Sequence, residues 1–218
     1  MPLELRQVEK SDIPAIGRMD RLVMKENGIS QAIWKIQEAA GIDTTYAFER
    51  FISTGMEHHA ETFWKIVDTD IDEMISVAKF SFQYHEGEAY QDTPVQGEEP
   101  PPQKLLEFFT WLNKESNAFA KENFAGRPHA RFTDLAFLAT HPSHRKRGAA
   151  HVLLEKGTQK ADEAGLDMYL QASLMGAQLY KKFGFEVMSV EEIDLSQYGV
   201  DKVETRTYMK RTTRAVGQ

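Results

Sequence analysis

The sequence predicts an α/β protein in which a mixed sheet is flanked by helices. Residues 131–140, 149–164 and 167–173 have the patterns of a strand, a helix and a strand joined by short turns. Such a unit implies a parallel, right-handed crossover. Two further pairs of strand-like runs, within 60–84 and 184–211, are expected to pair antiparallel. A single sheet with both kinds of pairing accommodates these observations.

The N-terminal half begins with a strand and continues with helices. Residues Leu3–Val8 alternate apolar and polar side chains, which is typical of a half-buried strand. Apolar residues at helical spacing follow from Ile13 onward, and Ser11 ahead of them is a suitable N-cap. The predicted helices of this half are 11–27, a segment around Trp34, and 41–59, and the predicted strands are 60–70 and 72–84.

A polar segment separates the two halves. Residues His85–Gln103 are acidic and proline-rich without apolar periodicity, which predicts a loop insertion in a single domain spanning 1–218. A loop of this length is usually either functional or disordered, so both a working lid and a mobile insertion stay open. The remaining predicted elements are a helix at 104–124, a strand at 131–140, a helix from Ala149 to Ala164 closed by Gly165, a strand at 167–173, a helix at 174–183, and strands at 184–195 and 203–211.

Composition narrows the classes of function. The 218 residues include 26 lysines and arginines against 33 acidic residues, a net charge of −7, which disfavours general binding to nucleic acid or anionic membranes. The absence of cysteine excludes disulfides, thiolate zinc sites and a cysteine nucleophile. No stretch approaches the ~20 apolar residues of a membrane span. We therefore expect a soluble, cytoplasmic protein without a metal site, and leave a homodimer open.

One cationic turn stands out in this acidic chain. The hexapeptide RKRGAA, Arg145–Ala150, lies between a predicted strand and a predicted helix. The N–H groups of a helix's first turn have no helical partners, and together with the helix dipole and cationic side chains they can bind an anion. The alternative is a solvated basic helix start without a ligand. Neither G-x-x-x-x-G-K-[ST] nor G-x-G-x-x-G occurs, so the two common nucleotide loops are not supported.

The helix after this turn has a narrow face of small residues. Ala150, Leu154, Gly157, Ala161 and Ala164 step by four and three residues and share one side. A glycine inside a helix costs about 1 kcal/mol relative to alanine, which close packing could offset. We expect this helix to lie close against the sheet.

The turn and its surroundings resemble a known family. Arg145–Ala150 matches the R/Q-x-x-G-x-G/A signature of the GNAT superfamily of acyl-CoA-dependent N-acetyltransferases. Residues 134–173 resemble that family's strand, pyrophosphate loop, helix and strand. The segment GAQLYKKFGFEVM, residues 176–188, resembles its next helix and the Y-x-x-x-GF ending. The resemblance covers roughly residues 131–190.

The resemblance implies a mostly antiparallel sheet whose strands four and five splay apart, with acetyl-CoA as co-substrate between them. The pyrophosphate would bind backbone N–H groups of the turn, and the pantetheine arm would pair with a strand edge. Ala150 stands where many relatives have glycine, and Ser173 stands where asparagine is common, which leaves the contact of Ser173 open. The implied cofactor-binding residues are Leu138, Ala139, Thr140, Arg145, Lys146, Arg147, Gly148, Ala149, Ala150, Ser173 and Tyr180.

Two residues are candidates for acid and base. Tyr180 occupies the family's general-acid position, and a phenol of pKa about 10 suits a thiolate of pKa ~8.5–9. The alternative is a tyrosine that packs its ring under the last strand. Asp134 resembles the acidic residue in the fourth strand of the histone-acetylating branch, where burial would raise its pKa and favour a base acting through water. The alternative is a hydrogen-bonded structural aspartate.

The function implied is direct transfer of an acetyl group from acetyl-CoA to a primary amine of a small molecule or peptide, in a ternary complex. The alternative is a non-catalytic acyl-CoA-binding or sensing domain of the same fold. The acidic balance of the chain favours a cationic acceptor. Carboxylates of the predicted loop that add to this balance are Glu86, Glu88, Asp92, Glu98 and Glu99.

Overall fold

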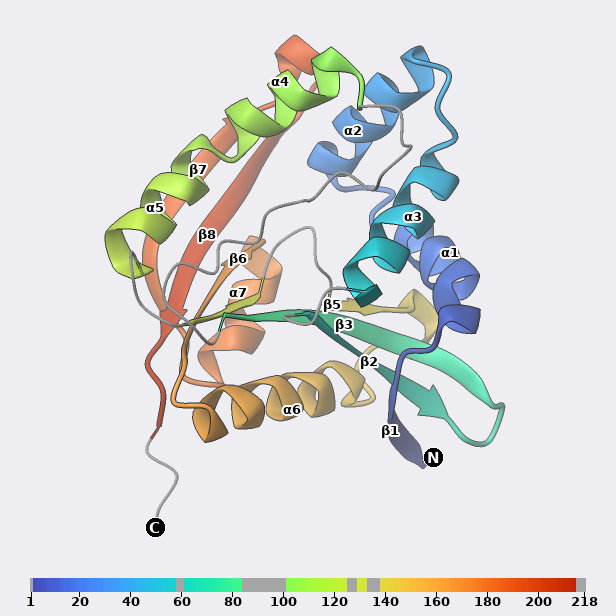
Figure 1. Ribbon diagram of the computed structural model, residues 1–218, viewed down its shortest axis with the longest axis vertical. Coiled ribbons are helices and arrows are strands. Elements are labelled where there is room, and N and C mark those ends of the chain that lie inside the picture. Colours follow the sequence, from blue (N-terminus) through green and yellow to red (C-terminus); the bar gives the residue numbers. More distant parts are fainter. Residues whose placement is uncertain (1, 58–60, 84–100, 125–128, 133–137, 215–218) are drawn as a thin grey trace.

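The computed structural model describes residues 2–57, 61–83, 101–124, 129–132 and 138–214. These residues form one sheet with helices on both faces (Figure 1). The strand order is β1-β2-β3-β4-β6-β8-β7, with β5 also paired to β3. The strands are β1 (Leu3–Gln7), β2 (Glu61–Asp68), β3 (Glu73–Gln83), β4 (His129–Phe132), β5 (Leu138–Thr140), β6 (Asp167–Ala172), β7 (Glu186–Asp194) and β8 (Val203–Arg211). The helices are α1 (Ile13–Val23), α2 (Gly28–Ala39), α3 (Thr44–Glu57), α4 (Gln103–Leu112), α5 (Lys114–Phe124), α6 (Ala149–Glu163) and α7 (Leu174–Lys181).

The sheet is mixed and mostly antiparallel, as expected. Within the described ranges, β4 and β6 form the single parallel pair, which runs from His129 opposite Asp167 to Phe132 opposite Leu170. Beyond this point β6 continues only against β8, whereas β5 pairs with β3. The family's fourth strand corresponds to β4 and β5 and its fifth strand to β6. Among the described residues β5 and β6 do not pair with each other, which agrees with the splayed arrangement.

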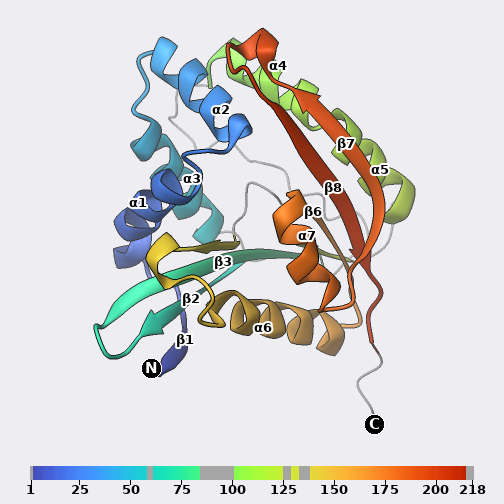
Figure 2. The ribbon, with the colours of Figure 1, turned by 180° about the vertical axis from the view of Figure 1, so that it is seen from behind.

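One face of the sheet is covered by α6 and α7 (Figures 1 and 2). Phe80 of β3 and Leu170 of β6 are fully buried against Leu153 of α6. A Cβ atom at Gly157 would lie only 2.0 Å from Cε1 of Phe80, so the glycine lets α6 approach β3. This confirms that α6 packs closely on the sheet. The buried side of α6, however, coincides only in part with the predicted one. Its buried residues are Ala149, Leu153, Leu154, Gly157, Thr158 and Ala161, while Ala150 is half-buried and Ala164 is exposed.

The opposite face is covered by two groups of helices. Because side chains alternate along a strand, Val77 of β3 and Tyr169 of β6 point away from α6. Val77 packs beneath α1 and α3 with Ile16 and Ile52. Tyr169 packs beneath α5, which lies farther along the sheet (Figure 1). The line along which the strands separate lies between these two groups.

Several element boundaries differ from those predicted. A short 3-10 turn, Lys10–Asp12, precedes α1, so Asp12 rather than Ser11 is its N-cap. The single helix predicted at 104–124 is two helices, because α4 ends with Asn113 as its C-cap and α5 begins at Lys114. The strand predicted at 131–140 is described as β4 and β5, with 133–137 outside the described residues.

Most of the predicted loop, residues 85–100, also lies outside the described part of the chain, and α4 begins at Gln103, inside its predicted end. In the ranges that are described, no helix combines the length and apolar character required to cross a bilayer.

Candidate active site

The turn between β5 and α6 has an unusual backbone. Gly148 is the N-cap of α6 and has a φ of 86°, in the left-handed region. Lys146, two residues earlier, is also left-handed with a φ of 63°. A left-handed conformation costs a non-glycine residue about 1–2 kcal/mol, so the turn stores strain at Lys146. Alternation of right- and left-handed residues directs successive N–H groups into a concave nest that binds anions.

The first turn of α6 offers N–H donors. The first bond of the helix runs from the Val152 N–H to the Gly148 carbonyl at 3.1 Å. The N–H groups of Ala149, Ala150 and His151 precede it and have no backbone acceptor in the described part of the chain. They lie at the positive end of the dipole of a 15-residue helix. The geometry of this helix start therefore suits a phosphate-like anion.

The three basic side chains of the turn are not equivalent. Nη2 of Arg147 lies 2.7 Å from Oδ2 of Asp68 at the end of β2, and Nη1 lies 2.7 Å from Nδ1 of His144. The hydrogen bond from Arg147 is the main reason why the pKa of the Asp68 carboxyl lies below its usual value. Arg147 thus ties the turn to the sheet, whereas Arg145 and Lys146 are exposed.

β5 supplies a strand edge next to the turn. Its residues Leu138–Thr140 pair with Ala78–Ser76 of β3 on one side. Among the described strands, none pairs with its other edge. The Ser76 hydroxyl, which lies 2.7 Å from the Ala139 carbonyl and 2.8 Å from the Thr140 hydroxyl, fixes β5 from the β3 side. The outer edge is the one that the resemblance assigns to the pantetheine arm.

α7 positions the candidate acid. The Ser173 hydroxyl caps α7 by accepting a hydrogen bond from the Gly176 N–H at 3.2 Å, so this side chain has a structural role. Tyr180 lies two turns later, is 8% exposed, and meets Phe185 edge to face with ring centroids 5.9 Å apart. The ring is therefore packed in the core beside Phe185, the residue that precedes β7. This packing is compatible with the Tyr180 hydroxyl acting as the general acid, a role that stays a prediction.

The base candidate Asp134 lies outside the described residues, so its role also stays a prediction. Among the described residues, another carboxyl group is buried. Asp20 on α1 is only 6% exposed, and burial raises its pKa from 3.8 to about 7 against the opposing attraction of Arg21. The only sequence signal for this residue is its position one turn after Ile16, on the apolar side of the helix.

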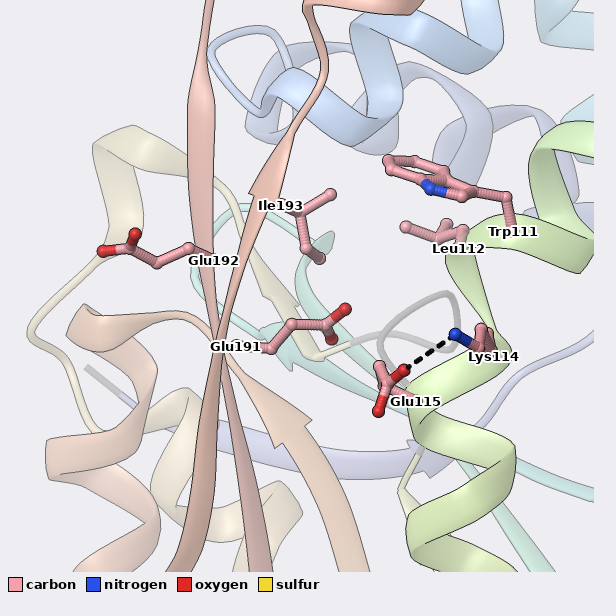
Figure 3. Close-up of a pocket in the computed structure, with 7 residues that line it drawn as sticks. All are labelled: Trp111, Leu112, Lys114, Glu115, Glu191, Glu192 and Ile193. Atoms are coloured by element: carbon pink, nitrogen blue, oxygen red, sulfur yellow. Dashed lines mark ion pairs between the residues drawn. The ribbon is translucent and has the colours of Figure 1, made fainter.

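A cavity lies elsewhere, between the α4–α5 junction and β7 (Figure 3). Glu191 points toward the start of α5, while Glu192 lies on the other side of the strand. Glu191 accepts a hydrogen bond from the Tyr208 hydroxyl at 2.6 Å. Since β8 separates β7 from β6, this cavity is away from the turn and the edge of β5. Its lining residues are Trp111, Leu112, Lys114, Glu115, Glu191, Glu192 and Ile193.

Comparison with known proteins agrees with this geometry. Residues 110–187 match the family model described as the acetyltransferase (GNAT) domain, a span that includes the turn, β6 and Tyr180. A comparison with curated protein sequences gave no match.

Solved structures share the fold across the chain. Arylalkylamine N-acetyltransferase 2 from Aedes aegypti is 12% identical, with 98% of this chain and 100% of that chain covered and a TM-score of 0.69. Mosquito arylalkylamine N-acetyltransferase like 5b is 15% identical, with 97% and 100% covered and a TM-score of 0.63. The ribosomal-protein-S18-alanine N-acetyltransferase from Escherichia coli is 12% identical, with 100% and 97% covered and a TM-score of 0.55. At such identities the likeness is one of fold. Residues 110–187 therefore resemble the acetyltransferase (GNAT) domain, and the chain as a whole shares the fold of solved N-acetyltransferases.

Proposed function

We propose that this protein is an acetyl-CoA-dependent N-acetyltransferase that transfers the acetyl group directly to a primary amine. The observation that carries the proposal is the nest at Lys146–Gly148 and the first turn of α6, placed next to the unpaired edge of β5. The nest and the helix start suit a pyrophosphate, and the strand edge suits a chain of amides. Acetyl-CoA contains a pyrophosphate followed by the two amides of its pantetheine arm.

The turn and the strand edge would divide the work of binding acetyl-CoA. The N–H groups of the turn from Lys146 to Ala150 hold the pyrophosphate, because the Arg145 N–H already points to the Pro142 carbonyl at 3.5 Å. The exposed side chains of Arg145 and Lys146 add local positive charge. The guanidinium of Arg147 holds the turn in place through Asp68. The pantetheine amides pair with Leu138–Thr140 in the manner of an added strand. An acidic protein can bind a polyanion in this way because most of the donors belong to the backbone.

The chemistry requires a neutral amine, a polarised carbonyl and a proton for the leaving sulfur. The amine nitrogen attacks the acetyl carbonyl, a C–N bond forms, and the C–S bond breaks. Tyr180 gives its phenolic proton to the coenzyme A thiolate. The nitrogen, now an amide, releases its extra proton, which returns the tyrosine to its neutral form through solvent. The acetyl group thus moves in one ternary complex, without an acyl-enzyme.

The acceptor class follows from charge. The net charge of −7 favours a cationic amine, either a small molecule or a peptide. The similar structures include enzymes named for arylalkylamines and for an alanine of a ribosomal protein, and both kinds of acceptor present an amine.

The proposal is tested by thiol release from acetyl-CoA across a panel of primary amines. We expect turnover with at least one cationic amine, and a fall in kcat of about a hundredfold for Tyr180→Phe, since general acids contribute on this scale. Acetyl-CoA should still raise the melting temperature of the Tyr180→Phe variant. A thermal shift without turnover on any amine would instead favour the non-catalytic acyl-CoA-binding domain. The absence of any thermal shift would contradict both functions.

A further inference from the structure

The path of α1 across the sheet is defined by three contacts. At its start, both carboxylate oxygens of Asp12 bind the Nζ of Lys65 on β2, at 2.7 and 2.6 Å. Farther along, Ile16 and Met19 join the apolar cluster that contains Val77 of β3 and Ala139 of β5. Figure 2 shows α1 beside β5, and the two elements are in contact. The helix is therefore tied to β2 just before its start and packs against β3 and β5 farther along.

Met19 and Asp20 are consecutive buried residues of α1, and Met19 belongs to the cluster that contains Ala139 of β5. The helix is in contact with β5. Asp20 therefore lies close to β5, the strand whose outer edge we assign to the arm of acetyl-CoA.

Asp20 is buried at this place without a partner. Its side chain has no hydrogen bond or ion pair with any described residue. The adjacent Arg21 turns its guanidinium over the ring of Trp34, at 4.0 Å, and lies 3.9 Å from Glu38. A buried carboxyl that lacks a partner is costly, so such groups concentrate at functional sites.

The other charged groups nearby do not provide a partner either. On α3, the Glu49 carboxylate lies 3.1 Å from the position of a Gly17 Cβ atom, one turn before Asp20. On β3, the ammonium of the buried Lys79 lies over Phe51 at 4.5 Å. On β2, Lys65 is paired with Asp12. None of these described groups forms a hydrogen bond or an ion pair with Asp20, so its carboxyl is available to a ligand with a positive charge.

We propose that Asp20 receives the ammonium group of the acceptor and takes one of its protons, as the general base of acetyl transfer. This inference rests on the function proposed above. The carboxylate accepts a proton from R–NH3⁺ and leaves R–NH2, whose lone pair attacks the acetyl carbonyl. Asp20 returns its proton to solvent after the amide has left. The net reaction converts one ammonium and acetyl-CoA into an amide, coenzyme A and one released proton.

The electrostatics of the site support this role. Burial raises the pKa of Asp20 from 3.8 to about 7, which makes the carboxylate roughly a thousandfold stronger as a base. It is then about half ionised near neutral pH, where a general base is most effective. An ordinary surface carboxylate would be a much weaker base for an ammonium.

The test is the pH dependence of kcat/KM for Asp20→Asn and the wild type, with an acceptor whose own pKa is near 10. For the wild type we expect an acid limb with an apparent pKa near 7. For Asp20→Asn we expect kcat/KM to fall at least a hundredfold at pH 7.5 and the limb near 7 to disappear. The thermal shift caused by acetyl-CoA should not change. Asp201→Asn, which removes an exposed carboxyl, is the matched control and should behave as the wild type.

The outcomes separate this inference from the proposed function. If Asp20→Asn keeps both the kcat/KM of the wild type and the acid limb near pH 7, the base is another group and the inference is wrong. The proposed acetyltransferase function would not be affected by that result. Loss of the limb in Asp134→Asn rather than in Asp20→Asn would assign the role to Asp134. If the wild type acetylates no amine, the proposed function and the inference are both wrong.

Discussion

Asp20 gives the folded chain a specific dependence on pH. Below pH 3.8 the carboxyl is protonated in the folded and the unfolded state, so it has no effect on stability. Between pH 4 and 7 the unfolded chain ionises this group and the folded chain does not, so stability falls as pH rises. The difference between 3.8 and about 7 corresponds to a loss on the order of 4 kcal/mol, complete above pH 7.

Asp20→Asn should therefore remove this contribution. We expect the variant to match the wild type near pH 4 and to be more stable than the wild type at pH 8. Urea unfolding of both proteins from pH 4 to 8 measures the difference. Two parallel profiles would contradict the buried, unpaired state of this carboxyl.

At the residue scale, the sequence predicted backbone conformation at the turn better than it predicted the contacts and burial of individual side chains. Gly148 was predicted from the signature of the turn, and its φ of 86° explains why glycine occupies this position. The partner of Arg147 was not predictable, because Asp68 is distant in the sequence and reaches the turn only through the sheet. The burial of Asp20 likewise depends on the direction in which α1 crosses β3 and β5, which no local pattern specifies.

The packing of α6 on β3 depends on Gly157. In an exposed helix, replacement of glycine by alanine adds about 1 kcal/mol of stability. Here the new Cβ atom would lie 2.0 Å from Cε1 of Phe80, a contact that requires movement of the ring or the helix. Overpacking of this kind costs about 1–3 kcal/mol, and we expect it to exceed the gain in helix propensity.

Gly157→Ala should accordingly lower the free energy of unfolding, by up to about 2 kcal/mol, measured by urea denaturation. The double variant Gly157→Ala/Phe80→Leu provides the control, because a smaller side chain on β3 leaves room for the methyl group. Its stability should be higher than the sum of the two single changes predicts. Additive effects would mean that the two residues do not share this contact.

At the scale of elements, the apolar periodicity predicted that a helix or strand is present, and which of the two it is, better than it predicted where the element begins and ends. The apolar pattern of 104–124 continues through Asn113, yet the chain forms α4 and α5 because each helix packs on a different part of the molecule. Phe108 of α4 belongs to the cluster with α2, whereas Phe119 of α5 packs on Tyr169 and Tyr208. The separation of β5 from β6 was predicted only through the family resemblance, because pairing between distant strands leaves no local signal.

At the scale of the whole molecule, the elements that carry the two proposed binding sites cover opposite faces of the sheet. The turn that suits acetyl-CoA begins α6, on one face, whereas Asp20 belongs to α1, on the other (Figures 1 and 2). In the described part of the chain β5 and β6 do not pair with each other, and this is where we propose that the amine and the thioester meet. Such an arrangement lets an amine reach a thioester without displacing the cofactor. The helices α4 and α5 lie away from both proposed binding sites. Their attachment to the sheet can therefore be tested without affecting the binding of acetyl-CoA.

Arg206 of β8 joins α4 and α5 to the sheet. Its Nη1 donates a hydrogen bond to the Leu112 carbonyl at the end of α4, at 2.9 Å, and lies 3.7 Å from the Glu191 carboxylate. The guanidinium is almost fully buried, so its loss leaves a helix-end carbonyl and a carboxylate poorly compensated.

Arg206→Met keeps an unbranched apolar stem and removes the charge and the hydrogen-bond donors. We expect the free energy of unfolding to fall by about 2–4 kcal/mol and amide hydrogen exchange to rise in residues 103–124, while the thermal shift with acetyl-CoA persists. Lys114→Met is the matched control, because Lys114 is exposed and its 3.7 Å ion pair with Glu115 contributes at most about 1 kcal/mol. Equal effects of the two substitutions would show that the buried guanidinium does not anchor this pair of helices. A loss of the acetyl-CoA shift in Arg206→Met would show instead that α4 and α5 support the cofactor site.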